Sequence, residues 1–325
     1  MRFKTFKYNN HNYTRERGEA FEAHLHENTD GIIEHPLGYY QKPEQNAQIP
    51  VMLFAPTIVN DGRRLIMSSE VILKLENVYK HFGGVKAVDG VDFEVSSNKI
   101  TGLIGPNGAG KSTIFNLITG FSEIDDGFIY FLDEDISYSS TQKTVDFGIV
   151  RTFQIPGELK TMSVMDNLLV SPRHHPGESL LFGWINRSKS KTFEKNTIEL
   201  AEKNLDIVGL THLKDEKAEN LSTGQKKLLE LGRILMMNPK LILLDEPAAG
   251  INPTLINNLS KIILDINKNQ KIDFLIIEHN MEFIMSISDE IIVMAEGKTL
   301  VKGSPKDIQK NQKVLDSYLG YGNNE

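Results

Sequence analysis

The stretch Gly105-Pro106-Asn107-Gly108-Ala109-Gly110-Lys111-Ser112 decides the fold, because it matches the pattern G-x-x-x-x-G-K-[ST]. The apolar run Ile100–Ile104 before it is typical of a buried strand, and Lys111–Thr119 after it favour a helix. Between a strand and a helix, glycines let backbone N–H groups turn inward around a phosphate, and the helix N-terminus adds positive partial charge. The stretch therefore predicts a phosphate-binding loop, with Lys111 reaching the β- and γ-phosphates of a nucleotide and the Ser112 hydroxyl binding Mg²⁺.

The chain around this loop alternates between strand and helix signals. Val71–Val78 and Val91–Val95 favour strands, with turns expected at Gly83-Gly84 and Asp89-Gly90. Two short apolar runs further on are typical of buried parallel strands, and a helical period lies between them. The runs are Leu241–Leu244 and Phe274–Ile277, and the helical period consists of Leu255, Leu259, Ile262, Ile263 and Ile266. These signals predict an α/β core.

Residues 156–238 are expected to form a helical insertion in this core. Ser163 and Asp166 make a capping box before Leu168-Leu169. A further helix is expected at Lys226–Met237. A helical stripe that stops at Gly209 comprises Thr197, Ala201, Leu205 and Val208.

Two adjacent carboxylates, Asp245 and Glu246, end the apolar run Leu241–Leu244. Side chains alternate along a strand, so the two carboxylates can have different tasks. We expect Asp245 to hold Mg²⁺ through its water shell, and Glu246 to orient and deprotonate an attacking water.

Composition narrows the function classes. The chain has 325 residues, of which 40% are hydrophobic, and its net charge of −7 gives no global basic field for nucleic acid. It has no cysteine, which excludes disulfides, thiolate metal sites and a cysteine nucleophile, and fits a reducing cytosol. No run approaches the roughly 18 apolar residues of a membrane span, and we expect no secretory signal. Any action at a membrane is therefore expected from its cytoplasmic face, through a partner.

Residues 1–66 differ from the rest, since they are polar and aromatic with no sustained period apart from an expected strand at Ile49–Ile58. Met67 resembles the start of a complete domain, so we expect an N-terminal extension at 1–66 and a domain at 67–325. The extension is either a loosely ordered or artefactual leader or a specific docking segment.

The segment Leu221-Ser222-Thr223-Gly224-Gln225 resembles the signature motif of ABC ATPases, with Thr223 where the commonest form has Gly. Other motifs of the family occur along the chain in the family's order. They are Phe82 as the adenine-stacking aromatic, Gln154 as the Q-loop glutamine, Ala248–Asn252 as the D-loop and His279 as the switch histidine. The resemblance covers about Val71 to Leu319. It implies a P-loop NTPase (RecA-like) core with an antiparallel β subdomain and a helical insertion.

The resemblance also implies a sandwich dimer, in which Ser222 and Gly224 of one chain contact the γ-phosphate bound by Lys111 of the other. The alternative for Ser222 is a helix cap that contacts no nucleotide. Phe82 is either the adenine contact or a core aromatic, and Tyr79 is the other candidate for the adenine contact. The implied catalytic residues are Glu246, His279 and Gln154, and the implied Mg²⁺ residues are Ser112, Gln154 and Asp245. The implied ATP-binding residues are Phe82, Gly105, Asn107, Gly108, Gly110, Lys111, Ser112, Thr113, Ser222 and Gly224.

Within the ABC family the chain resembles the ATPase subunits of branched-chain amino acid importers. This likeness rests on five stretches, which are Gly148–Gln154, Asp166–Leu169, Asp245–Pro253, Ile277–Met281 and Gly303–Gly320. It implies ATP-driven solute import at the cytoplasmic face of the plasma membrane. The implied partners are permease subunits, a second identical or different ATPase and, indirectly, a periplasmic or surface binding protein, with no nucleic acid. An apolar patch within Pro172–Lys191 is either a permease contact or local packing.

The alternatives are the ATPase of a lipopolysaccharide-export or urea-import system, or a non-transport soluble ABC ATPase. A P-loop kinase has no reason to keep Leu221–Gln225, and a GTPase would carry an N-K-x-D motif, which is missing from the sequence. Glu246 and His279 argue against a regulatory binder that holds ATP without hydrolysing it.

Overall fold

The computed structural model describes residues 71–152, 159–172 and 187–319, without the side chains of 187–191 and 318–319, together with short strands nearer the N-terminus. The chain divides into two compact units, Met1–Ser68 and Ser69–Glu325, and each is described by itself. The predicted strand Ile49–Ile58, the glutamine Gln154 and most of the predicted patch in Pro172–Lys191 lie outside the described residues.

In its described residues, the first unit consists of antiparallel strand pairs. Each pair is its own small antiparallel sheet, in which every residue of one strand is paired with a residue of the other. The pairs are β1 (Lys4–Tyr8) with β2 (His11–Arg15), β3 (Ile32–His35) with β4 (Gly38–Gln41), and β5 (Val59–Asn60) with β6 (Arg63–Arg64).

A six-stranded sheet with the order β12-β13-β14-β9-β15-β16 forms the centre of the second unit. Neighbouring strands are parallel except for β15 and β16. Every residue of β9, β13 and β14 is buried, as a parallel sheet covered on both faces requires. The strands are β9 (Ile100–Ile104), β12 (Ile149–Arg151), β13 (Leu241–Asp245), β14 (Asp273–Ile277), β15 (Glu290–Ala295) and β16 (Lys298–Gly303).

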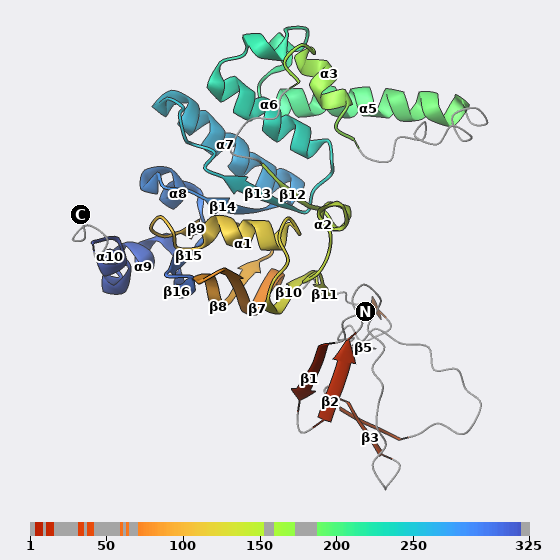
Figure 1. The fold of residues 1–325 in the computed structure, drawn as a ribbon. Helices are drawn as coiled ribbons and strands as arrows, with labels where there is room; N and C mark the ends of the chain where they lie inside the picture. Colours follow the sequence, from red (N-terminus) through yellow and green to blue (C-terminus); the bar gives the residue numbers. More distant parts are fainter. Residues whose placement is uncertain are drawn as a thin grey trace. The chain divides into compact units, whose positions relative to one another are not determined.

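Alternate residues of these strands enter two different cores. Leu241 and Leu243 pack with α1 (Lys111–Ile118) and the antiparallel sheet, whereas Ile242 and Leu244 pack with α7 (Pro253–Gln270). Figure 1 shows α1 between the two sheets, with α7 on the opposite face of the central sheet. The strand period of two therefore sets the layer order. The remaining helices of the core are α2 (Thr141–Phe147), α8 (Met281–Ile287), α9 (Pro305–Lys310) and α10 (Gln312–Leu319).

The antiparallel sheet has the order β11-β10-β7-β8. The predicted turn at Gly83-Gly84 is confirmed, but the predicted turn at Asp89-Gly90 is wrong, because both residues lie inside a long strand. The pairing shifts between Val78↔Val91 and Tyr79↔Asp89, so Gly90, with φ 76°, is the extra residue of a β-bulge. The strands are β7 (Val71–Phe82), β8 (Val85–Ser96), β10 (Asp126–Phe131) and β11 (Glu134–Asp135).

The helical insertion lies on the far side of the central sheet from the antiparallel sheet (Figure 1). Its helices are α3 (Val164–Leu169), α5 (Arg187–Ile207) and α6 (Thr223–Leu235), with short 3₁₀ turns η1 (Thr211–Leu213) and η2 (Ala218–Asn220). The predicted stripe is confirmed, since Ala201, Leu205 and Val208 are fully buried. Helix α6 begins before the predicted Lys226, because Ser222 caps it. The α/β core with an antiparallel sheet and a helical insertion is confirmed.

Candidate active site

The loop Gly105–Ser112 joins the carboxyl end of β9 to the first turn of α1, as predicted. A Cβ on Gly105 would lie 2.0 Å from the carbonyl oxygen of Met294, and one on Gly110 would lie 2.3 Å from that of Ala87. Both positions therefore exclude any side chain, because the loop packs directly against β15 and β8. Gly108 and Asn107 are on the exposed side of the loop, where the backbone is open to an approaching ligand.

Lys111 is buried at the start of α1, and its Nζ donates to the carbonyl oxygens of Gly105 (2.7 Å) and Pro106 (3.0 Å). Burial lowers the pKa of Lys111, and the negative charges of Glu246 and Asp245 act in the opposite direction. The ammonium group thus lies in the field of both strand-end carboxylates. Ser112, which follows Lys111, is exposed, and Thr113 is half-buried.

The two carboxylates differ in their surroundings. The Asp245 side chain is 1% exposed, whereas that of Glu246 is 35% exposed. Glu246 has φ 51°, an uncommon conformation for a residue with a side chain, and its backbone N–H donates to the carbonyl oxygen of Ile277 at 2.9 Å. This turn directs the peptide after β13 toward the end of β14.

His279 follows β14, and its Nε2 lies 3.3 Å from Oε1 of Glu246. The buried carboxylate of Glu278 fixes the main chain around this pair. It accepts hydrogen bonds from the backbone N–H groups of Ala248 (2.6 Å), His279 (2.9 Å) and Asn280 (3.1 Å). The start of the segment Ala248–Asn252 and the His279 turn are therefore held by one side chain.

Lys227 connects α6 to the same strand end. Its Nζ donates to the carbonyl oxygens of Glu246 and Pro247, each at 2.9 Å. Burial lowers the pKa of Lys227, and nearby carboxylates, with Glu278 first, act in the opposite direction. The helix that follows the signature segment is thus bonded directly to the backbone of Glu246.

The signature segment forms the N-terminus of α6. Ser222 is the N-cap: its Oγ accepts from the N–H of Gln225 at 3.3 Å, and the Gln225 side chain accepts from the N–H of Ser222 at 2.9 Å. Ser222 and Thr223 are exposed while Leu221 and Gly224 are buried. A Cβ on Gly224 would lie 2.6 Å from the Leu255 side chain. The segment therefore presents an exposed helix N-terminus, on which an anion is favoured.

Phe82 ends β7 and is 51% exposed as a residue, so it is not a core aromatic. It pairs with Val85 at the start of β8, and Ala87 of the same strand packs against Gly110. Phe82 thus stands on the hairpin next to the phosphate-binding loop. Tyr79 is directed elsewhere, since its hydroxyl lies against Gly90.

Arg151, at the end of β12, is a further member of the cluster. Its Nη2 donates to Asp245 Oδ2 at 2.7 Å and its Nη1 donates to Asn116 Oδ1 at 2.6 Å. Sequence reasoning missed Arg151, Lys227 and Glu278. The signal that could have indicated them is a charged residue at the end of an apolar strand or among the apolar positions of a helix. The predicted Gln154 lies outside the described residues.

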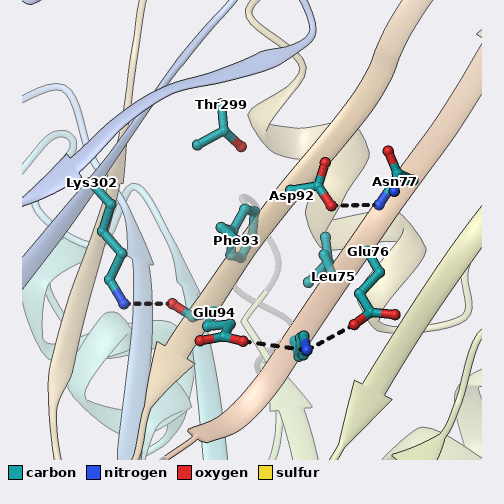
Figure 2. A pocket seen from close by; sticks show the side chains of 9 residues that line it. Leu75, Glu76, Asn77, Asp92, Phe93, Glu94, Thr299 and Lys302 are labelled. Carbon is teal, nitrogen blue, oxygen red and sulfur yellow. Dashed lines mark hydrogen bonds and ion pairs between the residues drawn. The ribbon is translucent and has the colours of Figure 1, made fainter.

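A separate pocket of about 620 Å³ lies on the antiparallel sheet, between β7, β8 and β16. Lys74 in this pocket forms ion pairs with Glu76 and Glu94. Figure 2 shows Lys302 donating to the backbone carbonyl oxygen of Glu94. None of the site residues named above lines this pocket.

Residues 88–249 match a family described as ABC transporter. A probable branched-chain amino acid transport ATP-binding protein, LivG of Methanocaldococcus jannaschii, is 42% identical over 257 residues, which make up 77% of this chain and 97% of the relative. The chain belongs to the ABC transporter family. It is the ATP-binding subunit of an ABC transporter, and such subunits are ATPases.

Two further comparisons agree with this assignment of the ABC subunit. The high-affinity branched-chain amino acid transport ATP-binding protein BraF of Pseudomonas aeruginosa is 37% identical over 252 residues, covering 78% of this chain and 99% of the relative. The solved ADP conformation of MJ1267, an ATP-binding cassette of an ABC transporter, matches with a TM-score of 0.67 and 41% identity, over 77% of this chain and 99% of that one. Among the described residues, no helix combines the length and apolar character that crossing a bilayer requires.

Proposed function

We propose that this ABC subunit binds MgATP at the carboxyl edge of its central sheet and hydrolyses it between two facing subunits. One observation carries the proposal: Lys111 lies in the field of Asp245 and Glu246, and His279 contacts Glu246, although these residues come from distant parts of the chain. In α/β sheets, the carboxyl ends of the strands are where ligands bind.

The residues at this edge fit a magnesium ion. Asp245 Oδ1 is buried and has no hydrogen-bond partner among the described residues, while Ser112 is exposed in the first turn of α1, directly after Lys111. A carboxylate and a hydroxyl are oxygen ligands of the type Mg²⁺ prefers. We assign Ser112, Asp245 and Gln154 to it. When bound, the ion neutralises charge on the β- and γ-phosphates.

The protein's own residues supply the rest of the chemistry. Lys111 exchanges the loop carbonyl oxygens that it now contacts for the β- and γ-phosphates, with the backbone of Gly105, Asn107, Gly108 and Gly110 around them. Glu246 orients a water and takes its proton. His279 contacts the γ-phosphate, and its Nε2 holds the carboxylate of Glu246 in place. Thr113 and Phe82 bind the remainder of the nucleotide.

The second half of each nucleotide site comes from a facing subunit. Ser222 and Gly224 at the N-terminus of α6 are assigned to the γ-phosphate held by Lys111 of that other subunit. ATP then favours the closed dimer because it binds that state more tightly, and hydrolysis removes the preference. The partner ATPase is a second copy or a related chain.

The nucleotide site is tested by Lys111→Ala. A fluorescent ATP analogue should show no saturable binding to this variant, while circular dichroism shows an unchanged fold. Exposed Lys261 on α7 offers the matched control, Lys261→Ala, which should bind as the wild type does. Normal affinity in Lys111→Ala would remove the lysine from the site.

For the solute, we propose branched-chain amino acids, imported through permease subunits at the cytoplasmic face of the membrane. The support is that the relatives LivG and BraF are named as branched-chain amino acid transport proteins. Reconstitution with the permeases and binding protein of the same system provides the test. Leucine-loaded binding protein should stimulate ATP hydrolysis and urea should not. If urea stimulates ATP hydrolysis and leucine does not, the transported solute is urea.

We also propose that the ATPase resides in residues 67–325. The relatives cover 77–78% of this chain, which leaves room for an extension outside the shared part. Deleting residues 1–66 should leave ATP hydrolysis unchanged. A loss of soluble protein on deletion would show instead that the extension is structural.

A further inference from the structure

Arg151 lies, mostly shielded from solvent, between two elements of the proposed nucleotide site. Its side chain is 12% exposed, and it bridges the carboxylate of Asp245 at the end of β13 and the amide oxygen of Asn116 on α1. Its Cζ lies 5.3 Å from the centre of the Phe115 ring, which is itself buried on α1. One side chain therefore ties the helix of the phosphate-binding loop to the strand-end carboxylate.

The bridge uses the shape of the guanidinium group. Nη1 and Nη2 donate to acceptors on two different elements, at 2.6 and 2.7 Å, so the plane of the group is fixed at both ends. A lysine carries the same charge but presents it as a point on a flexible stem, and it cannot reproduce this fork. The interaction thus fixes an orientation in addition to neutralising a charge.

The two oxygens of Asp245 differ as a result. Oδ2 accepts from Arg151, whereas Oδ1 is buried with no hydrogen-bond partner among the described residues. The Asp245 backbone is also fixed, because its N–H donates to Thr152 Oγ1 at 3.1 Å. A buried carboxylate oxygen left unpaired is costly, so its position calls for a ligand.

We propose that Arg151 is the positioning residue of the magnesium site: it occupies Oδ2 of Asp245 and, anchored by Asn116, keeps Oδ1 turned toward the hydrated ion. This inference rests on the proposed role of Asp245 in holding Mg²⁺. Groups that orient a metal-binding side chain typically change metal affinity by about 10- to 100-fold when they are replaced.

The test measures metal binding directly. Mn²⁺ serves as the probe and is titrated into the full chain with a non-hydrolysable ATP analogue, with free Mn²⁺ followed by electron paramagnetic resonance. Arg151→Lys should weaken Mn²⁺ binding about tenfold or more. Affinity for the nucleotide alone, measured in EDTA, should stay at the wild-type value. Wild-type Mn²⁺ affinity, or an equal loss in EDTA, overturns the proposal.

Two controls separate this role from others. Asn116→Ala keeps the ion pair and removes one anchor, and it should weaken Mn²⁺ binding in the same direction but less. Unchanged Mn²⁺ affinity in Asn116→Ala overturns the proposal even where Arg151→Lys does not fold. Lys143, whose Nζ lies 5.7 Å from the Phe147 ring on the surface, gives a cation–ring control, and Lys143→Ala should change nothing.

Asp245→Asn distinguishes the positioning role of Arg151 from the proposed role of Asp245 in holding Mg²⁺. If this variant binds Mn²⁺ as tightly as the wild type, the proposed role of Asp245 fails. If Asp245→Asn weakens Mn²⁺ binding while Arg151→Lys does not, only the positioning role of Arg151 fails.

Discussion

His279 Nε2 lies 3.3 Å from Glu246 Oε1, and the two residues follow the neighbouring parallel strands β14 and β13. Their side chains are partly open to solvent, but their main chain is fixed. Glu246 N–H donates to the Ile277 carbonyl oxygen, and the buried Glu278 carboxylate accepts the N–H of His279. In the proposed role of Glu246 as the base, a carboxylate held this way before substrate arrives needs little reorganisation during the reaction.

Glu246→Gln keeps the size of the side chain and removes its capacity to take a proton. We expect ATP hydrolysis to fall by a factor of about 100 or more, in line with the loss of a general base, while ATP binding is retained. The ATP-bound dimer should then accumulate and be visible by size-exclusion chromatography with light scattering. Unchanged turnover would exclude Glu246 as the base.

The contact between His279 and Glu246 predicts that their substitutions do not add. His279→Ala alone should lower turnover strongly, and the double variant with Glu246→Gln should be scarcely slower than the worse single variant. Steady-state rates of the four proteins form the cycle. Multiplicative losses would mean that the two side chains act independently.

Phe82 and Tyr79 can be separated by nucleotide affinity. Phe82→Ala should raise the dissociation constant for ATP by about tenfold, or about 1.4 kcal/mol, which lies within the roughly 1–3 kcal/mol of an aromatic stacked on a base. Binding of inorganic triphosphate should not change, because it has no base. Tyr79→Phe removes only the hydroxyl that lies against Gly90 and should bind ATP normally. The opposite pattern would assign adenine contact to Tyr79.

Lys227→Met tests the link between α6 and the end of β13, where the proposed base Glu246 lies. The substitution leaves the carbonyl oxygens of Glu246 and Pro247 without their donor, which costs about 1–3 kcal/mol of unfolding free energy. Turnover should fall with it, because the Glu246 backbone loses an anchor. Lys261→Met, at an exposed position on α7, should stay within about 0.5 kcal/mol in urea unfolding. Equal stabilities would show that the Lys227 contacts contribute nothing.

Local patterns predicted the elements whose signals are contained in a few residues. The strand Ile100–Ile104 and the helix from Lys111 agree with prediction, because an apolar run and a glycine-rich loop each act locally. The Asp89-Gly90 pair misled because a β-bulge and a turn both require φ > 0 at glycine. Only the opposite strand decides between them, and its register is a long-range property.

Residues that connect distant elements were not predictable in this way. Arg151 bonds Asp245, and Lys227 bonds the backbone after Asp245, across separations that no local period encodes. The resemblance supplied Glu246 and His279 as candidates, and the structure adds that the two are in contact. The buried groups that hold Glu246 and His279 could be identified only from the three-dimensional structure.

The pH dependence of stability has an identifiable source in Asp273, at the start of β14. Burial raises the pKa of Asp273 from 3.8 to about 6, although the backbone N–H groups of Lys99 and Asn98 act in the opposite direction. Between about pH 4 and 6 the folded chain keeps a proton that the unfolded chain has released. The contribution of Asp273 to stability therefore falls as the pH rises through this window and stays low above it.

Asp273→Asn should reveal this contribution, because asparagine stays neutral and can still accept the Lys99 N–H, now 2.9 Å from Oδ1. The variant should be more stable than the wild type above pH 6, by an amount on the order of 3 kcal/mol, and the gain should vanish near pH 4. Urea unfolding between pH 4 and 8 measures both curves. Asp126→Asn is the matched control, since Asp126 also accepts a backbone N–H, that of Gly127 at 2.9 Å, but at an exposed position. Parallel curves for Asp273→Asn and the wild type would mean that the buried carboxylate pays no desolvation penalty at neutral pH.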